Sequence, residues 1–134
     1  MKKTLFTLFI TVVMALSLLT LSGCGKYTSH YKAVAFVHTN TTKKASMSFS
    51  SFEGTMVFKL KCESDDKKIN YSAKLENGSA TVFYDCNGTK TELFSINSGN
   101  DITEIGGVLQ KGTVYIIIET SEVAEDGCFN FEVK

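Results

Sequence analysis

The chain has 134 residues, and its 14 basic and 14 acidic residues give a formal net charge of zero at neutral pH. Every basic residue is a lysine. Arginine is the usual side chain for bidentate recognition of phosphate, and no basic stripe is visible, so we exclude a nucleic acid as the partner.

The N-terminal segment is typical of a secretory signal peptide. Residues 1–3 carry two lysines, and residues 5–21 are apolar apart from isolated serines and threonines. Leu21, Ser22, Gly23 and Cys24 then resemble the lipobox of bacterial lipoproteins. The resemblance implies cleavage before Cys24, lipidation (a palmitate-type acyl anchor) at Cys24, and a location on the extracytoplasmic face of the cell membrane.

Two alternatives to lipidation remain open, namely ordinary secretion and a retained membrane helix. The apolar stretch at 5–21 just reaches the length of a membrane span. No cluster of positive charge follows it to stop transfer, which favours the lipoprotein interpretation. We therefore divide the chain into a signal peptide (1–23), a lipidated tether (24–31) and a single domain (32–134).

The first strands of this domain are expected at 32–39 and 45–63. Met56, Phe58, Leu60 and Cys62 alternate with more polar residues, which predicts a half-buried strand. Residues 52–54 interrupt the pattern before this stretch and predict a corner.

Asn77-Gly78 follows a strand pattern over 69–76 and supplies the residues that a two-residue type I′ turn requires. We therefore expect a hairpin that pairs Leu75 with Ala80 and Tyr71 with Tyr84. The apolar faces of both strands would then lie on the same side of one sheet.

A second Asn-Gly pair, at 87–88, leads into a strand at 90–96 whose register stays open. A two-residue loop would place Phe94 and Ile96 outside, whereas a five-residue loop would place them in the core. Phe83 and Phe94 are the candidate ligand surface, if they form an exposed apolar patch.

Residues 113–120 include an uninterrupted, β-branched apolar run and predict a central strand that is buried on both faces. We expect an acidic loop at 121–127 and a last strand at 129–133. The count of about eight or nine strands, with no helix after the signal peptide, predicts an all-β fold. An antiparallel, jelly-roll-like β-sandwich is favoured because alternating strands need a second sheet over their apolar faces.

The corner at 51–54, the turn at 76–78 and the ending at 112–131 resemble small jelly-roll or sandwich modules of secreted Gram-positive proteins, such as pre-peptidase C-terminal-like domains. The resemblance implies an accessory or binding role, and its motifs are turns and core positions rather than functional residues.

With Cys24 lipidated, Cys62, Cys86 and Cys128 leave an odd number of thiols, so at most one disulfide can form among them. Periodicity favours Cys62 with Cys86, and a Cys62–Cys128 bridge stays open. The sequence has no C-x-x-C motif and no metal-binding histidine pair. We expect neither a cofactor nor a metal ion, and calcium binding by the acidic loop stays open.

The sequence therefore predicts a non-enzymatic envelope lipoprotein that binds a glycan or another envelope protein. The alternative is an inhibitor of an extracellular enzyme, because small β-barrel lysozyme inhibitors are similar in having a lipobox and cysteines placed like Cys62 and Cys128. The G-x-S-x-G motif of an esterase type of enzyme does not occur in residues 24–134.

Overall fold

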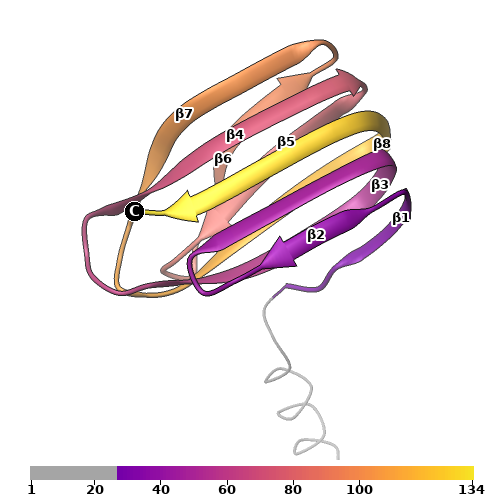
Figure 1. Cartoon of the computed structure of the whole chain (residues 1–134). Helices are drawn as coiled ribbons and strands as arrows, with labels where there is room; N and C mark the ends of the chain where they lie inside the picture. The colour runs from indigo at the N-terminus through magenta and orange to yellow at the C-terminus, as the bar shows by residue number, and fades with distance from the viewer. Residues whose placement is uncertain (1–26) are drawn as a thin grey trace, which may run out of the picture.

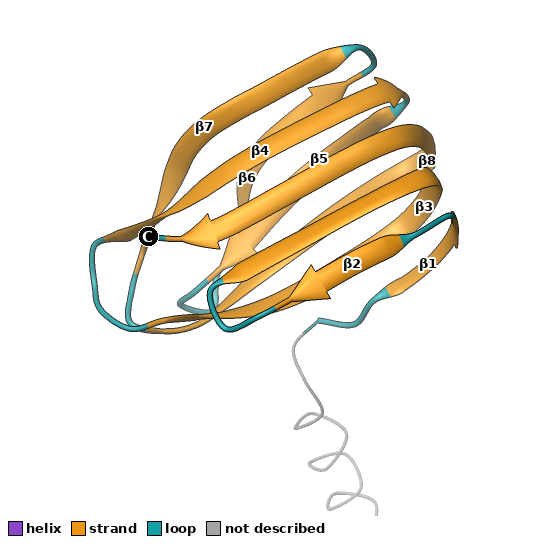
Figure 2. Cartoon of the chain, viewed as in Figure 1, coloured by secondary structure: helices purple, strands orange, loops and turns teal. Residues whose placement is uncertain are grey.

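The computed structural model describes residues 27–134 (Figures 1 and 2), and this part of the chain is built from eight antiparallel strands without a helix. The strands are β1 (His30–Val34), β2 (Val37–Asn40), β3 (Lys44–Cys62), β4 (Lys67–Asn77), β5 (Ser79–Asp85), β6 (Thr91–Asn97), β7 (Asn100–Leu109) and β8 (Gly112–Val133). The all-β sandwich prediction is confirmed. The signal peptide and the lipobox at residues 21–24 lie outside the described residues.

Two long strands, β3 with 19 residues and β8 with 22, run through both layers of the sandwich. The first sheet has the order β2, β3, β8, β4, β7 and uses the first half of β3 and the second half of β8. The second sheet has the order β1, β3, β8, β5, β6 and uses the other halves. Figure 1 shows the two layers facing each other.

The bend of β3 lies at the predicted corner. The register against β8 shifts between Phe52 and Gly54, where extra residues on β8 make a bulge. Gly54 has a φ of 127°, and its backbone N–H donates to Thr120 Oγ1 at 2.9 Å. The Phe52 side chain points inward at the bend and is fully buried. The chain therefore turns from one sheet into the other without breaking the strand.

The core lies between the layers and comes from the inward phase of each strand. Met56, Phe58, Leu60 and Cys62 are buried, as the alternation of β3 predicts. The aliphatic residues of the apolar run of β8 are also buried, and the run lies in the middle of the second sheet, between β3 and β5. The prediction of a central strand at 113–120 is confirmed.

The hairpin prediction at Asn77-Gly78 is wrong. β4 pairs with β7 and β8, whereas β5 pairs with β6 and β8, so the turn carries the chain from the first sheet to the second. Ser98 Oγ accepts the Gly78 N–H at 2.9 Å and ties this turn to the next one. Residue alternation identified the inward-facing side chains of β4 and β5 correctly. It could not show whether these strands are neighbours in one sheet or face each other from the two sheets, as they do here.

Three other expectations are settled by the strand register and the strand bounds. Phe94 and Ile96 are 8% and 1% exposed, so the longer loop before β6 is the correct alternative. The expected loop at 121–127 is instead part of β8, which bends there around the buried side chain of Ala124. The expected strand at 32–39 is divided into β1 and β2 by Ala35, which has a φ of 50°.

Within residues 27–134, no helix has the length and apolar character needed to cross a membrane.

Candidate binding face

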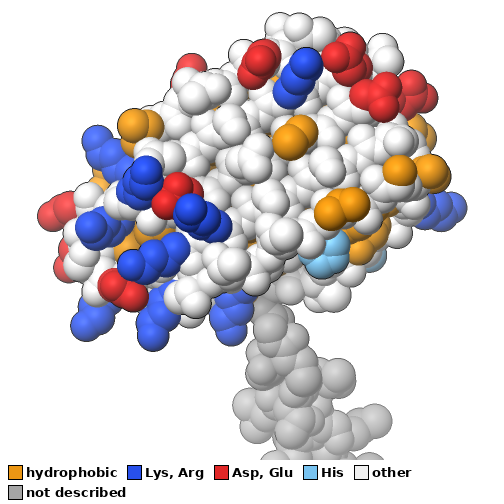
Figure 3. Space-filling model, in the orientation of Figure 1, with side chains coloured by type: hydrophobic (Ala, Val, Ile, Leu, Met, Phe, Trp, Pro, Cys, Tyr) orange, Lys and Arg blue, Asp and Glu red, His pale blue; other side chains and the backbone are white. Residues whose placement is uncertain are grey.

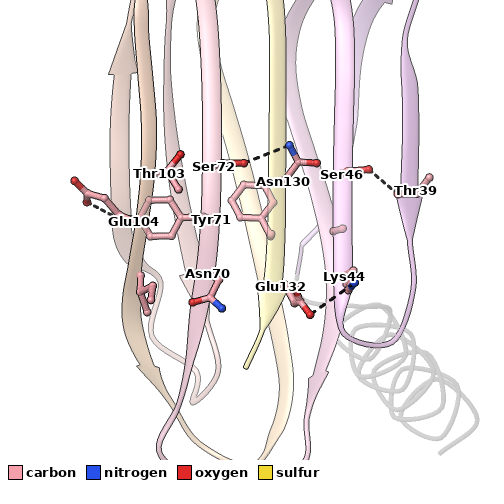
Figure 4. Close-up of a pocket in the computed structure, with 13 residues that line it drawn as sticks. Thr39, Lys44, Ser46, Asn70, Tyr71, Ser72, Thr103, Glu104, Asn130 and Glu132 are labelled. Atoms are coloured by element: carbon pink, nitrogen blue, oxygen red, sulfur yellow. Dashed lines mark hydrogen bonds and ion pairs between the residues drawn. The ribbon is translucent and has the colours of Figure 1, made fainter.

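A row of small polar side chains crosses the outer face of the first sheet. Each member is the direct cross-strand partner of the next, from β2 through β3, β8 and β4 to β7. In spatial order the row is Thr39, Ser46, Asn130, Ser72 and Thr103. Figure 4 shows these side chains at one level across the strands. Four strand spacings of about 4.8 Å make the row roughly 19 Å long.

The polar row exists because the residues that point away from the core are polar in the parts of these strands that pair with one another. β3 contributes serines at alternate positions on the face that does not enter the core, and β4 contributes Asn70 and Ser72 in the same way. The register brings these phases to the same level. Figure 3, which shows this face, has mainly uncharged polar surface at its centre.

Hydrogen bonds within the polar row use part of its bonding capacity. The hydroxyls of Thr39 and Ser46 are 2.6 Å apart, and Asn130 Nδ2 donates to Ser72 Oγ at 3.4 Å and approaches Cys128 Sγ at 3.5 Å. Within residues 27–134, Asn130 Oδ1 and Thr103 Oγ1 accept no side-chain bond. The polar row therefore offers both donors and acceptors to a ligand.

The polar row forms the middle of a shallow groove of about 640 Å³. On one side Lys44 Nζ lies 3.8 Å from Glu132 Oε1, and Asn70 and the exposed Ile105 continue the same level. The wall that these residues form combines an ion pair, an amide and one aliphatic side chain.

Tyr71 fixes the end of the groove at the edge strand β7. Its ring stacks on the ring of Phe94 with the centroids 4.6 Å apart, and its hydroxyl donates to Glu104 Oε2 at 3.1 Å. Burial is the main cause that raises the pKa of Tyr71, and the bond to Glu104 raises the pKa further. This contact joins Tyr71 to its direct cross-strand partner and so ties β4 to the edge strand β7.

The two phenylalanines that the sequence proposed as a ligand surface do not come together. Phe94 is buried in the core, where it packs against Tyr71, Phe129 and Phe131, so it cannot form a surface site. Phe83 is half-buried on β5, and Lys90 Nζ lies 4.3 Å from its ring centroid.

A second polar contact fastens the N-terminal end of the described chain to the body. Tyr27 donates from its hydroxyl to Asp85 Oδ2 at 2.6 Å, and its ring meets Tyr115 edge-on at 5.3 Å. Desolvation, followed by the bond to Asp85, raises the pKa of Tyr27 to about 12. Asp85 Oδ1 also accepts the N–H of Gly88 at 2.7 Å and so shapes the β5–β6 loop.

The three described cysteines are free thiols. Cys62 is buried at the end of β3, whereas Cys86 directly follows β5, and these strands flank β8 on opposite sides. Two strand spacings are about 9.5 Å, which exceeds the Cα separation of about 7 Å that a disulfide can span. The candidate Cys62–Cys86 disulfide is therefore not formed. Cys128 is exposed on the outer face of the first sheet, so it does not pair with the buried Cys62 either.

Among residues 27–134, no group of three or more His, Cys, Asp or Glu side chains is arranged to hold a metal ion. Glu122, Glu125 and Asp126 belong to the bend of β8, where their side chains are exposed. His30 and His38 lie on separate edge strands, and the His38 ring stacks on Phe36 at 5.1 Å.

The polar row was not identified from the sequence. Its members are ordinary serines, threonines and an asparagine, spread over strands that are far apart in the chain. The signal that could have found them is the run of small polar residues in the outward phase of β3, β4 and β8. Recognising the row from this run also requires the correct strand order, and the predicted hairpin at Asn77-Gly78 gave a wrong order.

No protein-family model and no curated protein sequence matches the chain. Solved structures that it resembles include a periplasmic inhibitor of g-type lysozyme from Aeromonas hydrophila. The sequence identity is 10%, the match covers 69% of this chain and 88% of that chain, and the TM-score is 0.48. A family 4 carbohydrate-binding module shares 10% identity over 76% of this chain and 80% of its own, with a TM-score of 0.39. A family 35 carbohydrate-binding module from Paenibacillus barcinonensis shares 15% identity over 82% and 85%, with a TM-score of 0.34. These similarities are too distant to support an argument about function.

Proposed function

We propose that the protein is a non-enzymatic binding module of the cell envelope and that the polar row binds an extended, uncharged glycan. The observation that carries the proposal is the alignment of Thr39, Ser46, Asn130, Ser72 and Thr103 across all five strands of one sheet.

Hydroxyl and amide groups suit a glycan because both partners can donate and accept hydrogen bonds. These groups do not titrate near neutral pH, so they support recognition rather than acid–base catalysis. The fully buried centre of a protein–protein interface is on average more apolar than the rest of the surface. The groove offers Ile105 as its one exposed large aliphatic side chain.

The length of the polar row indicates a polymer rather than a single sugar. A ligand that spans roughly 19 Å can contact every strand of the sheet at once. Each neutral hydrogen bond contributes about 0.5–1.5 kcal/mol, so one row gives a weak affinity that grows with the length of the oligosaccharide.

The polar row can be tested by replacing Asn130, its central member. Asn130→Ala should weaken binding of a long oligosaccharide about fivefold to tenfold, because it removes donors and an acceptor that the ligand uses. The measurement is calorimetry against a panel of wall-derived and neutral oligosaccharides of increasing length.

Ser95→Ala is the matched control for this experiment. Like Asn130, Ser95 is within hydrogen-bonding distance of a hydroxyl on the adjacent strand, with its Oγ 3.2 Å from Thr81 Oγ1. Unlike Asn130, it lies on the outer face of the second sheet. This change should leave binding as it is in the wild type. Equal effects of the two variants, or no binding of any oligosaccharide, would reject the assignment of the polar row.

The membrane attachment at Cys24 is part of the same proposal and has a separate test. Cys24→Ala removes the thiol that the lipobox presents for acylation, so the variant should leave the membrane fraction. If it stays with the membranes in the absence of detergent, the lipoprotein interpretation is wrong.

A Cys62–Cys128 disulfide would favour the alternative function, that of an enzyme inhibitor. Both cysteines are free thiols, Cys62 buried and Cys128 exposed. We therefore favour the glycan-binding module.

A further inference from the structure

Lysines gather at one end of the sandwich, where the β2–β3, β3–β4 and β7–β8 connections and residue 134 meet. The members of this lysine end are Lys43, Lys44, Lys61, Lys67, Lys68, Lys111 and Lys134. Backbone bonds hold the connections together: Lys61 N–H donates to Thr42 O at 2.8 Å, and Lys68 and Lys134 exchange two bonds of 2.9 Å. Figure 3 shows the lysines concentrated at the left of the molecule.

Positive charge exceeds negative charge at the lysine end. Its seven lysines are accompanied by four carboxylates, those of Glu63, Asp65, Asp66 and Glu132. Glu63 is engaged by Lys43 at 3.3 Å. Within residues 27–134, Lys61 and Lys67 form no ion pair. They face a hollow of about 380 Å³.

The opposite end of the sandwich is acidic. Glu76, Asp101 and the three acids of the β8 bend lie there, close to the β4–β5 and β6–β7 turns. Lys74 lies among them, with its ammonium group 3.9 Å from Glu76 Oε1, and Lys32 is the cross-strand partner of Glu53 at the neighbouring corner of β3. The protein therefore has strongly separated charges although its formal net charge is zero.

The described chain begins on the side of β3 that leads to the lysine end. β1 pairs with β3 from His30 opposite Thr55, and Val57 N–H donates to Ser29 Oγ at 2.8 Å. Going back to Tyr27, the chain therefore runs toward Lys59 and Lys61. Two residues separate Tyr27 from Cys24, and the three Cα-to-Cα steps between them span at most about 11 Å.

From this geometry we infer that the lysine end is a docking surface for an anionic phospholipid membrane. A basic patch strengthens the membrane attachment of a lipid-anchored protein. Each lysine near an anionic membrane surface contributes about 1 kcal/mol, or about a fivefold gain in affinity. Charge complementarity and the short distance from the anchor position favour a membrane over a soluble anion. The inference rests on the proposed lipid anchor at Cys24 and is independent of glycan binding by the polar row.

The test uses residues 25–134, because every residue of the hydrophobic core lies within this part of the chain. Binding is measured to vesicles of phosphatidylcholine alone and to vesicles that also contain phosphatidylglycerol. We expect binding to the anionic vesicles only. Raising the salt from about 0.1 M to about 1 M, which shortens the Debye length from about 10 Å to about 3 Å, should abolish it.

The variant pair Lys61→Gln/Lys67→Gln should weaken binding to anionic vesicles by about 25-fold. Lys32→Gln/Lys74→Gln is the matched control, since it removes two charges from parts of the protein outside the lysine end. The control should bind as the wild type does. Thermal unfolding of both variants verifies that they fold.

Three results would overturn the inference. The first is equal binding to neutral and anionic vesicles. The second is equal weakening by the two variant pairs, because net charge alone would then explain the binding. The third is binding of soluble polyphosphate as tight as that of vesicles at the same phosphate concentration, which would reassign the lysine end to a soluble anionic polymer.

Discussion

At the scale of single residues, the contact between Tyr27 and Asp85 fastens the start of the described chain to the β5–β6 loop. Asp85 is the one charged residue among 27–134 that is buried, and it accepts hydrogen bonds from the Tyr27 hydroxyl and the Gly88 N–H. Tyr27→Phe should lower the free energy of unfolding by about 1–3 kcal/mol, because it removes a donor from a buried carboxylate. Urea unfolding at neutral pH measures this change.

The same residue should make stability depend on alkaline pH. The folded-state pKa of Tyr27 is raised from 10.0 to about 12, so the protonated hydroxyl stabilises the fold fully below pH 10. This contribution is lost as the pH rises through about 12. Tyr27→Phe should be less sensitive than the wild type over this interval. Parallel unfolding curves of the two proteins against pH would contradict the assignment.

Phe94 and Phe83 test which aromatic side chain belongs to the core. Phe94→Ala should cost about 3–5 kcal/mol of unfolding free energy, because it removes a ring that is stacked between the layers. Phe83→Ala should cost less than half as much, because Phe83 is half-buried on the outer face. Denaturant unfolding of both variants provides the comparison, and the reverse order would mean that β6 has the other register.

At the scale of elements, the bend of β3 decides how one strand serves two sheets. A Cβ at Gly54 would come 2.4 Å from His30 O and 2.8 Å from Tyr31 Cα, both backbone atoms of β1. Gly54→Ala should therefore destabilise the protein by about 3 kcal/mol or more, since neither the backbone conformation nor the neighbouring strand can adapt.

Gly112→Ala is the control for this prediction. Gly112 has a comparable φ of 136°, but a Cβ there would meet no atom within 4 Å. The difference between the two variants isolates the contact with β1. Equal losses in thermal unfolding would show that the backbone conformation alone is responsible.

The elements also show what the sequence could and could not predict. Residue alternation identifies the inward face of β3, β4, β5 and β8, because burial follows the period of the strand. It does not identify the partner of a strand. Leu75 and Ala80 both point into the core, yet they lie in different sheets. The bend at 121–127 was missed for a related reason, since exposed acids look alike in a loop and in a bent strand.

At the scale of the whole molecule, the candidate site depends on the topology. The polar row joins residues between 39 and 130, and none of them is unusual alone. The two long bent strands place the first half of β3 beside the second half of β8, and this pairing sets Ser46 opposite Asn130. The site could therefore be recognised only after the strand order was known.

The separation of positive and negative charge would orient the molecule on a membrane. The lysine end and the acidic end lie at opposite ends of the strands (Figure 3). The groove lies on the outer face of the first sheet and adjoins the lysine end, since Glu132 lines both hollows. If the lysine end docks on a membrane, the groove faces sideways and stays open to a long polymer.

The most direct test of glycan binding by the polar row is an NMR titration of residues 25–134 with a long neutral oligosaccharide. We predict that shifts concentrate at Ser46, Ser72, Thr103 and Asn130 and are absent at Thr81 and Ser95 on the other outer face. Shifts centred on Phe83 or on the β8 bend would contradict the account. So would the absence of shifts at saturating concentrations of every oligosaccharide in the panel.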